Sequence, residues 1–246
     1  MLAHRGGRGP WRENTVEAFS AATGLGADGV ELDVRRAACG ALVVHHDPFI
    51  PGLGPVHQLR SEELPPWVPT LTEALTACSG AAVDVEVKNS PCEPGYDRSE
   101  SIAAEVCEVL SGTDGRGTAR LPSRVVVSSF STGTVAALVS AGAGVPVGML
   151  ASPGSDAVAV SERAAALGCS AMHTFHLGVT ARFVAGVHDL GMAVVAWTVD
   201  DPGQAEAMLQ AGVDVIISDE VPKVLRAIRV ASGLDRGAGS RGESAT

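Results

Sequence analysis

The amino-acid sequence predicts an α/β protein, a (β/α)8 TIM barrel with a small hairpin and loop insertion after the second barrel strand. Its 246 residues are close to the roughly 250 that this fold usually takes. Hydrophobic residues make up 46% of the chain and aromatic residues only 4%, a balance that suits parallel strands covered by helices of small residues. Strand-like and helix-like segments also alternate along the chain. We therefore expect a single domain over residues 1–232.

Nine short apolar segments are expected to be strands. Two of them cannot be joined by a helix, because the segment RRAACG between Val34 and Ala41 is too short for a crossover of about a dozen residues. These two segments should form a hairpin, and setting the second aside leaves the eight strands that close a barrel. The segments are residues 2–4, 29–34, 41–46, 82–87, 124–128, 145–150, 170–173, 193–198 and 213–217.

Helix-like segments occupy most of the gaps between these strands. Several begin with a Ser, Thr or Asp cap and end near a glycine such as Gly168 or Gly212, as capped helices do. They supply the crossovers that parallel strands require. The segments are residues 15–25, 99–110, 132–141, 155–167, 180–190, 202–210 and 221–231.

Two stretches do not fit the alternation. Residues 48–69 are rich in Pro, Gly and polar residues, and together with the hairpin they are expected to form an insertion over the barrel mouth, at about residues 38–70. Residues 233–246 contain Gly, Ser, Arg and Ala with almost nothing to bury, so we expect a disordered tail there.

Composition narrows the classes of function. A net charge of −10 without a cluster of Lys or Arg argues against nucleic-acid binding. No apolar run approaches the ~20 residues of a membrane span, so no stable membrane anchor is expected. The chain starts directly on a strand-like segment, which leaves no room for a signal peptide and favours a cytoplasmic location.

The five scattered cysteines lack a Cys-x-x-Cys spacing and are expected to be free thiols. Oligomeric state does not follow from the sequence.

Charged residues interrupt two of the apolar strands. Glu31 and Asp33 lie in GVELDV, and Glu86 and Lys88 lie in AAVDVEVK. Residues at positions i and i+2 of a strand point to the same face, so each pair projects together. Burying such charges is costly unless a cation or an ionic partner compensates. The pattern therefore predicts a metal and phosphate site.

The barrel topology would bring these residues to one place, because active sites of TIM barrels lie at the carboxyl ends of the strands. His4 and Arg5 follow the first strand, and His46 lies at the tip of the hairpin. Carboxylates without nearby cysteine suit a hard cation, Mg²⁺ or Ca²⁺. Arg5 and Lys88 would neutralise a phosphoryl group, and two histidines can move protons near neutral pH. This combination favours phosphodiester cleavage.

An ordered series of segments resembles the glycerophosphodiester phosphodiesterase family, from Leu2 to about Pro222. The segments are AHRGGRGPWRENTVEAF, GVELDVRRAACGALVVHHDP, VPTLTEAL, DVEVKN, VVVSSF, VAWTVDD and VDVIISD. The resemblance implies metal-dependent hydrolysis of small glycerophosphodiesters, such as glycerophosphocholine or glycerophosphoethanolamine, to sn-glycerol 3-phosphate and an alcohol. It leaves open which histidine is the acid, and whether water or a neighbouring glycerol hydroxyl attacks first.

The resemblance also implies roles for individual residues. His4 and His46 match the family's acid/base pair, and Glu13 and Asn14 match its Glu-Asn-Thr motif beside the site. The residues that match the other family positions are Glu31, Asp33 and Glu86 as metal ligands, Arg5 and Lys88 as phosphate contacts, and Phe130 and Trp197 as the apolar substrate wall.

Some assignments stay open. His45 precedes His46, and a shift of the hairpin register by one residue would exchange their faces. His173 ends an expected strand facing the mouth and is a candidate for ligand or substrate contact. Apolar residues of the insertion, Phe49, Leu53, Leu64 and Trp67, favour lysophospholipid or phosphoinositide substrates as an alternative. A non-catalytic glycerophosphodiester-binding protein is the alternative from another class.

Overall fold

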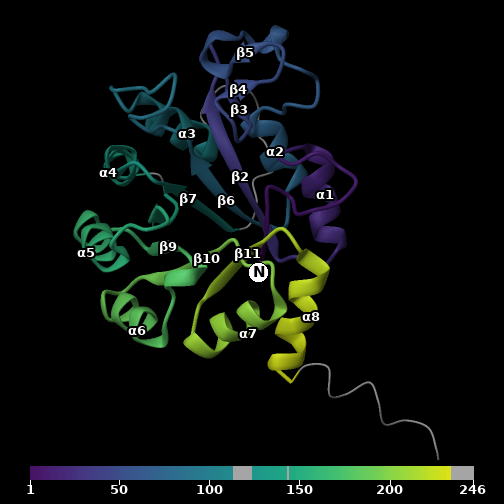
Figure 1. Ribbon diagram of the computed structural model, residues 1–246. Coiled ribbons are helices and arrows are strands. Elements are labelled where there is room, and N and C mark those ends of the chain that lie inside the picture. Colours follow the sequence, from purple (N-terminus) through teal and green to yellow (C-terminus); the bar gives the residue numbers. More distant parts are fainter. Residues whose placement is uncertain (113–123, 143, 234–246) are drawn as a thin grey trace, which may run out of the picture.

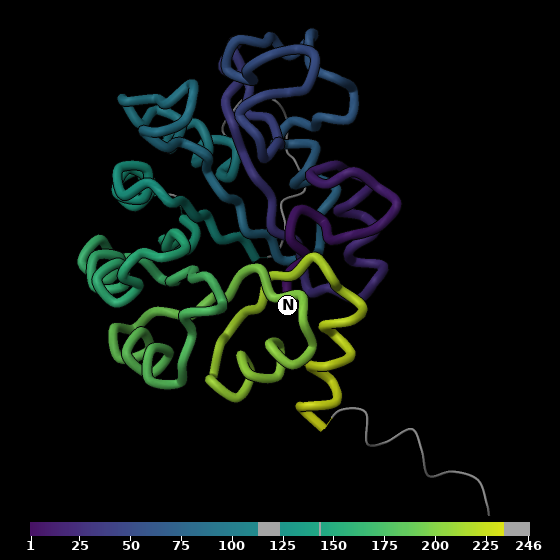
Figure 2. Tube along the Cα trace, in the orientation of Figure 1, coloured from purple at the N-terminus to yellow at the C-terminus, as the bar shows by residue number. Residues whose placement is uncertain are grey.

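The fold is a closed barrel of eight parallel strands surrounded by helices (Figure 1), as seen in the computed structural model, which describes residues 1–112, 124–142 and 144–233. β1 pairs with both β2 and β11, which closes the sheet on itself. Figure 2 shows the N-terminal segment beside the last part of the described chain, in keeping with this pairing. The barrel strands are β1 (Leu2–His4), β2 (Gly29–Arg36), β6 (Ala82–Val87), β7 (Arg124–Ser129), β8 (Val147–Leu150), β9 (Ala171–Phe175), β10 (Ala193–Trp197) and β11 (Val215–Ser218).

Helices form the outer ring of the barrel (Figure 1). Their starts follow local chemistry, since Thr15 caps α1 and Asp201 accepts hydrogen bonds from the first backbone N–H groups of α7. α2 was missing from the expected helices, although Thr70 and Glu73 form a capping box that marks its start. The helices are α1 (Val16–Gly24), α2 (Leu71–Ala77), α3 (Ser101–Ser111), α4 (Thr132–Ala141), α5 (Ala157–Leu167), α6 (Ala181–Asp189), α7 (Pro202–Ala211) and α8 (Val221–Ala231).

The main hydrophobic core lies between the strands and the helices. Phe19 on α1, Leu75 on α2 and Leu138 on α4 are fully buried there against side chains of the strands, such as Leu32 on β2. Burial of each such side chain stabilises the fold by about 1.5–3 kcal/mol. The outward faces of the strands therefore bind the helices, and the polar side chains of alternate positions are left for the barrel interior.

The expected hairpin is present. β3 (Leu42–Val44) pairs antiparallel with β2, with Val34 opposite Val44 and Arg36 opposite Leu42. The insertion that follows contains β4 (Phe49–Ile50), β5 (Gly54–Pro55) and two 3-10 turns, Val56–Gln58 and Ser61–Glu63. It packs around a small apolar cluster of its own that is shared with the hairpin, formed by Ala37, Ala41, Val43, Ile50, Val56 and Val68.

Three further expectations concern the chain as a whole. None of the described helices has the length and hydropathy of a membrane span. All five cysteines are unpaired. The expected tail lies outside the described residues except for Gly233, which follows α8.

Candidate active site

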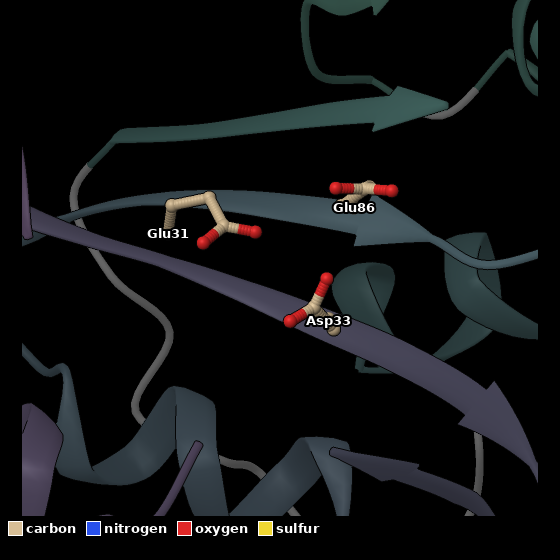
Figure 3. A group of neighbouring side chains, drawn as sticks. All are labelled: Glu31, Asp33 and Glu86. Atoms are coloured by element: carbon tan, nitrogen blue, oxygen red, sulfur yellow. The ribbon is translucent and has the colours of Figure 1, made fainter. Parts of the chain in front are cut away.

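Three buried carboxylates meet inside one end of the barrel. Glu31 and Asp33 project from β2 and Glu86 from the neighbouring β6, where Asp33 and Glu86 are directly opposite each other in the strand register (Figure 3). One carboxylate oxygen from each residue lies within 4.8 Å of the others. Their relative exposures are only 4%, 1% and 7%. The pairing of β2 with β6 therefore converts two separate strand patterns into one acidic cluster.

Two cations partly compensate the cluster. The Nζ atom of Lys88 lies 3.0 Å from Oδ1 of Asp33 and 2.5 Å from Oε1 of Glu86. On the opposite side, Nε of Arg5 lies 3.2 Å from Oδ2 of Asp33, and the backbone N–H of Arg5 donates to Glu31 at 3.1 Å. Asp33 is thus held between two positive charges, whereas no lysine or arginine side chain in the described part of the chain forms an ion pair with Glu31.

The pKa values of the three carboxyl groups shift in different directions, because the neighbouring positive charges compensate them unequally. Burial acts to raise the pKa of Asp33, but Lys88 and Arg5 outweigh it and keep that carboxyl below its ordinary value. Burial raises the pKa of Glu86 to about 6, against the opposing effect of Lys88. Burial and then the charges of Asp33 and Glu86 raise the pKa of Glu31 well above its usual range. In the described part of the chain, Oε1 of Glu31 has no hydrogen-bond partner.

The first loop is fixed to this cluster by Asn14. Its side-chain N–H donates to Oδ2 of Asp33 at 2.7 Å, and its Oδ1 accepts the backbone N–H of Asp33 at 3.2 Å. Asn14 has a φ of +56°, a left-handed conformation that asparagine tolerates better than most residues. The loop conformation thereby supplies a donor that helps to hold Asp33 as an anion.

His4 lies at the rim of the same cluster. Its Nδ1 is 2.7 Å from Oδ1 of Asp219, and its Nε2 is 3.9 Å from Oε2 of Glu31. Burial acts to raise the pKa of Asp219, but the hydrogen bond and charge of His4 prevail and lower it. Asp219 follows the last strand and was not predicted as a site residue, although VIISD places an acidic residue at a strand end.

The hairpin presents His46 to the cluster and turns His45 aside. Nδ1 of His46 is 2.7 Å from Oδ1 of Asp47. Burial lowers the pKa of His46 below its ordinary value, and the charge of Lys88 acts in the same direction. His45 instead contacts the carbonyl of Asp47 at 2.8 Å and packs on Trp67 with ring centroids 5.8 Å apart. The observed register therefore favours His46 over His45.

A cavity of about 300 Å³ joins these groups. Its polar side includes His4, Arg5, Glu31, His46, Glu86 and Lys88, and its apolar side includes Phe130, Leu150, Trp197 and Ile217. Phe130 meets Trp197 edge to face with centroids 5.6 Å apart, and Phe175 packs on the same indole at 5.5 Å. None of the described cavity walls comes from residues 48–69. A wider groove of about 570 Å³ between α7 and α8 contains none of these groups.

His173 does not face this cavity. It is 1% exposed in the barrel interior, with Nδ1 3.2 Å from Oδ2 of Asp84, and Asp84 accepts a hydrogen bond from Ser128 at 2.8 Å. His173 lines a second cavity of about 360 Å³ at the amino-terminal ends of the strands. The expected strand ended at His173, but β9 continues to Phe175, which places the mouth beyond the histidine.

Comparisons with known proteins agree with this geometry. A sequence model of the Glycerophosphoryl diester phosphodiesterase family matches residues 4–223. The chain is 28% identical to a glycerophosphodiester phosphodiesterase of Caldanaerobacter subterraneus subsp. tengcongensis, over 93% of this chain and 97% of that protein. It is 31% identical to a probable glycerophosphodiester phosphodiesterase 2 of Mycobacterium tuberculosis, over 89% and 86%. The structure of a phosphodiesterase from Oleispira antarctica in complex with the product sn-glycerol-3-phosphate superposes with a TM-score of 0.79 at 25% identity, over 92% and 95%.

Proposed function

Because the chain belongs to the glycerophosphoryl diester phosphodiesterase family and is an enzyme of this class, we propose that it hydrolyses small glycerophosphodiesters such as glycerophosphocholine and glycerophosphoethanolamine. The products would be sn-glycerol 3-phosphate and an alcohol. One observation carries the proposal: two carboxylates of the acidic cluster, Glu31 and Glu86, share the walls of one cavity with two cations and two histidines. Each of these groups has a role in phosphodiester hydrolysis.

The carboxylates fit a divalent cation, Mg²⁺ or Ca²⁺. Glu31, Asp33 and Glu86 offer only oxygen ligands, which hard cations prefer. The raised pKa of Glu31, and its Oε1 without a partner among the described residues, indicate a buried carboxylate that needs more positive charge than this part of the chain supplies. When bound, such an ion polarises the phosphoryl group.

Arg5 and Lys88 would hold the non-bridging phosphate oxygens. Asp33 and Glu86 raise the pKa of Lys88 above its ordinary value even though burial opposes this, so its ammonium keeps its charge throughout the neutral range. The guanidinium of Arg5 is partly buried and fixed by Asp33 and Glu13. Both cations are therefore oriented before the substrate arrives, which lowers the cost of binding the phosphate.

His4 and His46 would move the protons. One accepts a proton from the attacking hydroxyl, and the other donates a proton to the leaving alkoxide. Asp219 contacts Nδ1 of His4 and Asp47 contacts Nδ1 of His46, so in each case Nε2 is the nitrogen left for the reaction. The lowered pKa of His46 leaves this imidazole neutral near pH 7.

The apolar side of the cavity would receive the glycerol carbons. Phe130 and Trp197 add aromatic surface to the cavity walls, and Nζ of Lys88 lies 5.8 Å from the centroid of the Phe130 ring. A volume of about 300 Å³ suits a compact diester. The lysophospholipid alternative would require the insertion to extend this wall, and Phe49 and Leu53, each 49% exposed, are not among the cavity residues.

The test is release of sn-glycerol 3-phosphate from glycerophosphocholine, measured with Mg²⁺, with Ca²⁺ and with excess chelator. We expect turnover with at least one ion and loss of turnover with chelator. Absence of release with either ion would contradict the proposed substrate class, and lysophospholipids would then be tested under the same conditions.

Variants of the histidines show whether the activity belongs to this site. His4→Ala and His46→Ala should each lower kcat by about 10²- to 10⁴-fold, the usual contribution of a general acid or base. His45→Ala is the matched control and should retain most activity, because His45 lies outside the cavity walls. An active His46→Ala variant together with an inactive His45→Ala variant would reverse the assignment.

A further inference from the structure

Strand β2 carries three charged residues on one face. Glu31, Asp33 and Arg35 occupy alternate positions, so their side chains leave the strand in the same direction. Arg35 is only 5% exposed and lies one step beyond the carboxylates toward the rim of the barrel. Burying a guanidinium costs free energy unless its N–H donors are hydrogen-bonded, so Arg35 must have acceptors close to it.

The guanidinium of Arg35 holds the backbone of the hairpin tip. Its Nε and Nη2 both donate to the carbonyl oxygen of His46, at 2.8 and 2.5 Å. Its remaining arm, Nη1, donates to Oε2 of Glu93 at 2.7 Å. The contact with His46 is a two-pronged clamp on the main chain of that residue, so it leaves the imidazole free to face the cavity.

Arg35 thereby joins the two loops that bear site residues. His46 follows β3, whereas Glu93 lies in the segment between β6 and α3, which starts at Lys88. The backbone N–H of Lys88 donates to the carbonyl of Val34, the residue before Arg35. A shift of the Arg35 side chain would move the hairpin tip relative to the phosphate-binding lysine.

We propose that Arg35 is a positioning residue that sets the location of the His46 imidazole relative to the carboxylate cluster. The inference rests on the proposed function, because the location of the His46 imidazole matters only if His46 moves a proton in that reaction. Arg35 has no direct contact with the substrate cavity among the described residues, so it acts only through the main chain of His46. Displacement of a catalytic group by about 1 Å can cost on the order of 10²-fold in rate.

Arg35→Met and the milder Arg35→Lys are the variants to make. Met keeps an unbranched apolar chain in place of the arginine stem and removes every donor, and we expect kcat to fall by about 10²-fold with KM little changed. Lys keeps the positive charge and can reach one acceptor, so kcat should fall less in Arg35→Lys than in Arg35→Met. The control is Arg36→Met, because Arg36 contacts Asp97 at 2.9 Å and Glu105 at 2.7 Å and leaves β2 on the other face.

A second readout does not depend on turnover. The ¹H–¹³C resonance of the His46 ring, assigned by its loss in His46→Ala, should shift or broaden in Arg35→Met and Arg35→Lys but remain unchanged in Arg36→Met. An unmoved His46 resonance in a folded Arg35 variant, or wild-type kcat in that variant, would overturn the inference. An inactive wild-type protein would instead refute the proposed function, and the ring resonance would still decide whether Arg35 places His46.

Discussion

At the scale of single residues, the site is defined by how well each buried charge is compensated. Asp33 lies between Lys88 and Arg5 and is also hydrogen-bonded by Asn14, so it remains an anion. Glu31, on the same strand face, accepts only the backbone N–H of Arg5 and has one oxygen without a partner among the described residues. Two carboxylates of the same strand therefore differ in character because of what surrounds them, which residue identity alone does not show.

Asp219→Asn tests the carboxylate that contacts His4. Asp219 accepts from Nδ1 of His4 and so fixes the orientation of the ring. The amide would keep the shape but lose the charge, and we expect kcat to fall by about 10²-fold with a smaller change in KM. Steady-state kinetics on glycerophosphocholine measure both parameters.

The control for Asp219 is Asp214→Asn, which changes another aspartate of an Asp–His pair. Asp214 contacts Nε2 of His188 at 2.8 Å, on the exposed surface of the protein. This variant should keep kcat within about threefold of wild type, as expected for a weak surface pair. Equal losses of kcat in both variants would indicate a general effect on stability rather than a specific role of Asp219.

At the scale of elements, each barrel strand must leave room for the side chains that its neighbouring strands project into the barrel. His173 projects from β9 into the interior, and its ring reaches Gly148 of β8, two residues before its register partner Leu150. A Cβ atom at residue 148 would lie 2.5 Å from Nε2 of His173 and 2.8 Å from its Cδ2. Gly148 is therefore present to make room for the imidazole, and its role is spatial, because no left-handed φ is recorded for it.

Gly148→Ala should destabilise the protein by about 1–3 kcal/mol, the usual cost of overpacking an interior. Urea unfolding measures this loss as a lower midpoint. Adding His173→Ala should recover part of it, since the two sites are in contact and are expected to couple by about 0.5–3 kcal/mol. Gly186→Ala on α6 is the control, because a Cβ there has no neighbour within 4 Å. Equal midpoints for Gly148→Ala and Gly186→Ala would contradict the packing argument.

At the scale of the whole molecule, the β2–β6 pairing that creates the acidic cluster exists only in the folded barrel, so binding of the ion and folding should be linked. A divalent ion at about 100 times its Kd would stabilise the folded state by about 2.7 kcal/mol, or roughly 5–10 °C in Tm for a chain of this size. Thermal unfolding with Mg²⁺, with Ca²⁺ and with chelator measures this shift. Glu31→Gln should reduce it, because the ion would lose one of its three carboxylates.

The same shift should depend on pH in a predictable direction. The pKa of Glu86 is raised to about 6, and that of Glu31 is raised well above its ordinary value. A raised carboxyl pKa means that the folded, ion-free protein takes up protons as the pH falls through about 6, and this uptake competes with the ion. The ion-induced rise in Tm should therefore be largest above pH 7 and shrink toward pH 5. A rise that is constant between pH 5 and 8 would contradict the involvement of these carboxylates.

The eight barrel strands and the hairpin could be predicted from the sequence, because their signals are local. Short apolar runs and the short RRAACG connection need no information about distant parts of the chain. Helix α2 was missed although its capping box is visible at Thr70 and Glu73. The prediction that His173 faces the mouth was wrong, because the end of β9 is set by pairing with β10 up to Phe175.

The sequence by itself determined which charged residues interrupt the strands and which face of each strand they share. Only the tertiary structure decided which of them meet. The β2–β6 register sets Asp33 opposite Glu86, the closure of β1 onto β11 brings Asp219 to His4, and the clamp from Arg35 holds the main chain of His46. The physical reason is that periodicity is a property of neighbouring residues, whereas a distance between two strands depends on the pairing of segments far apart in the chain.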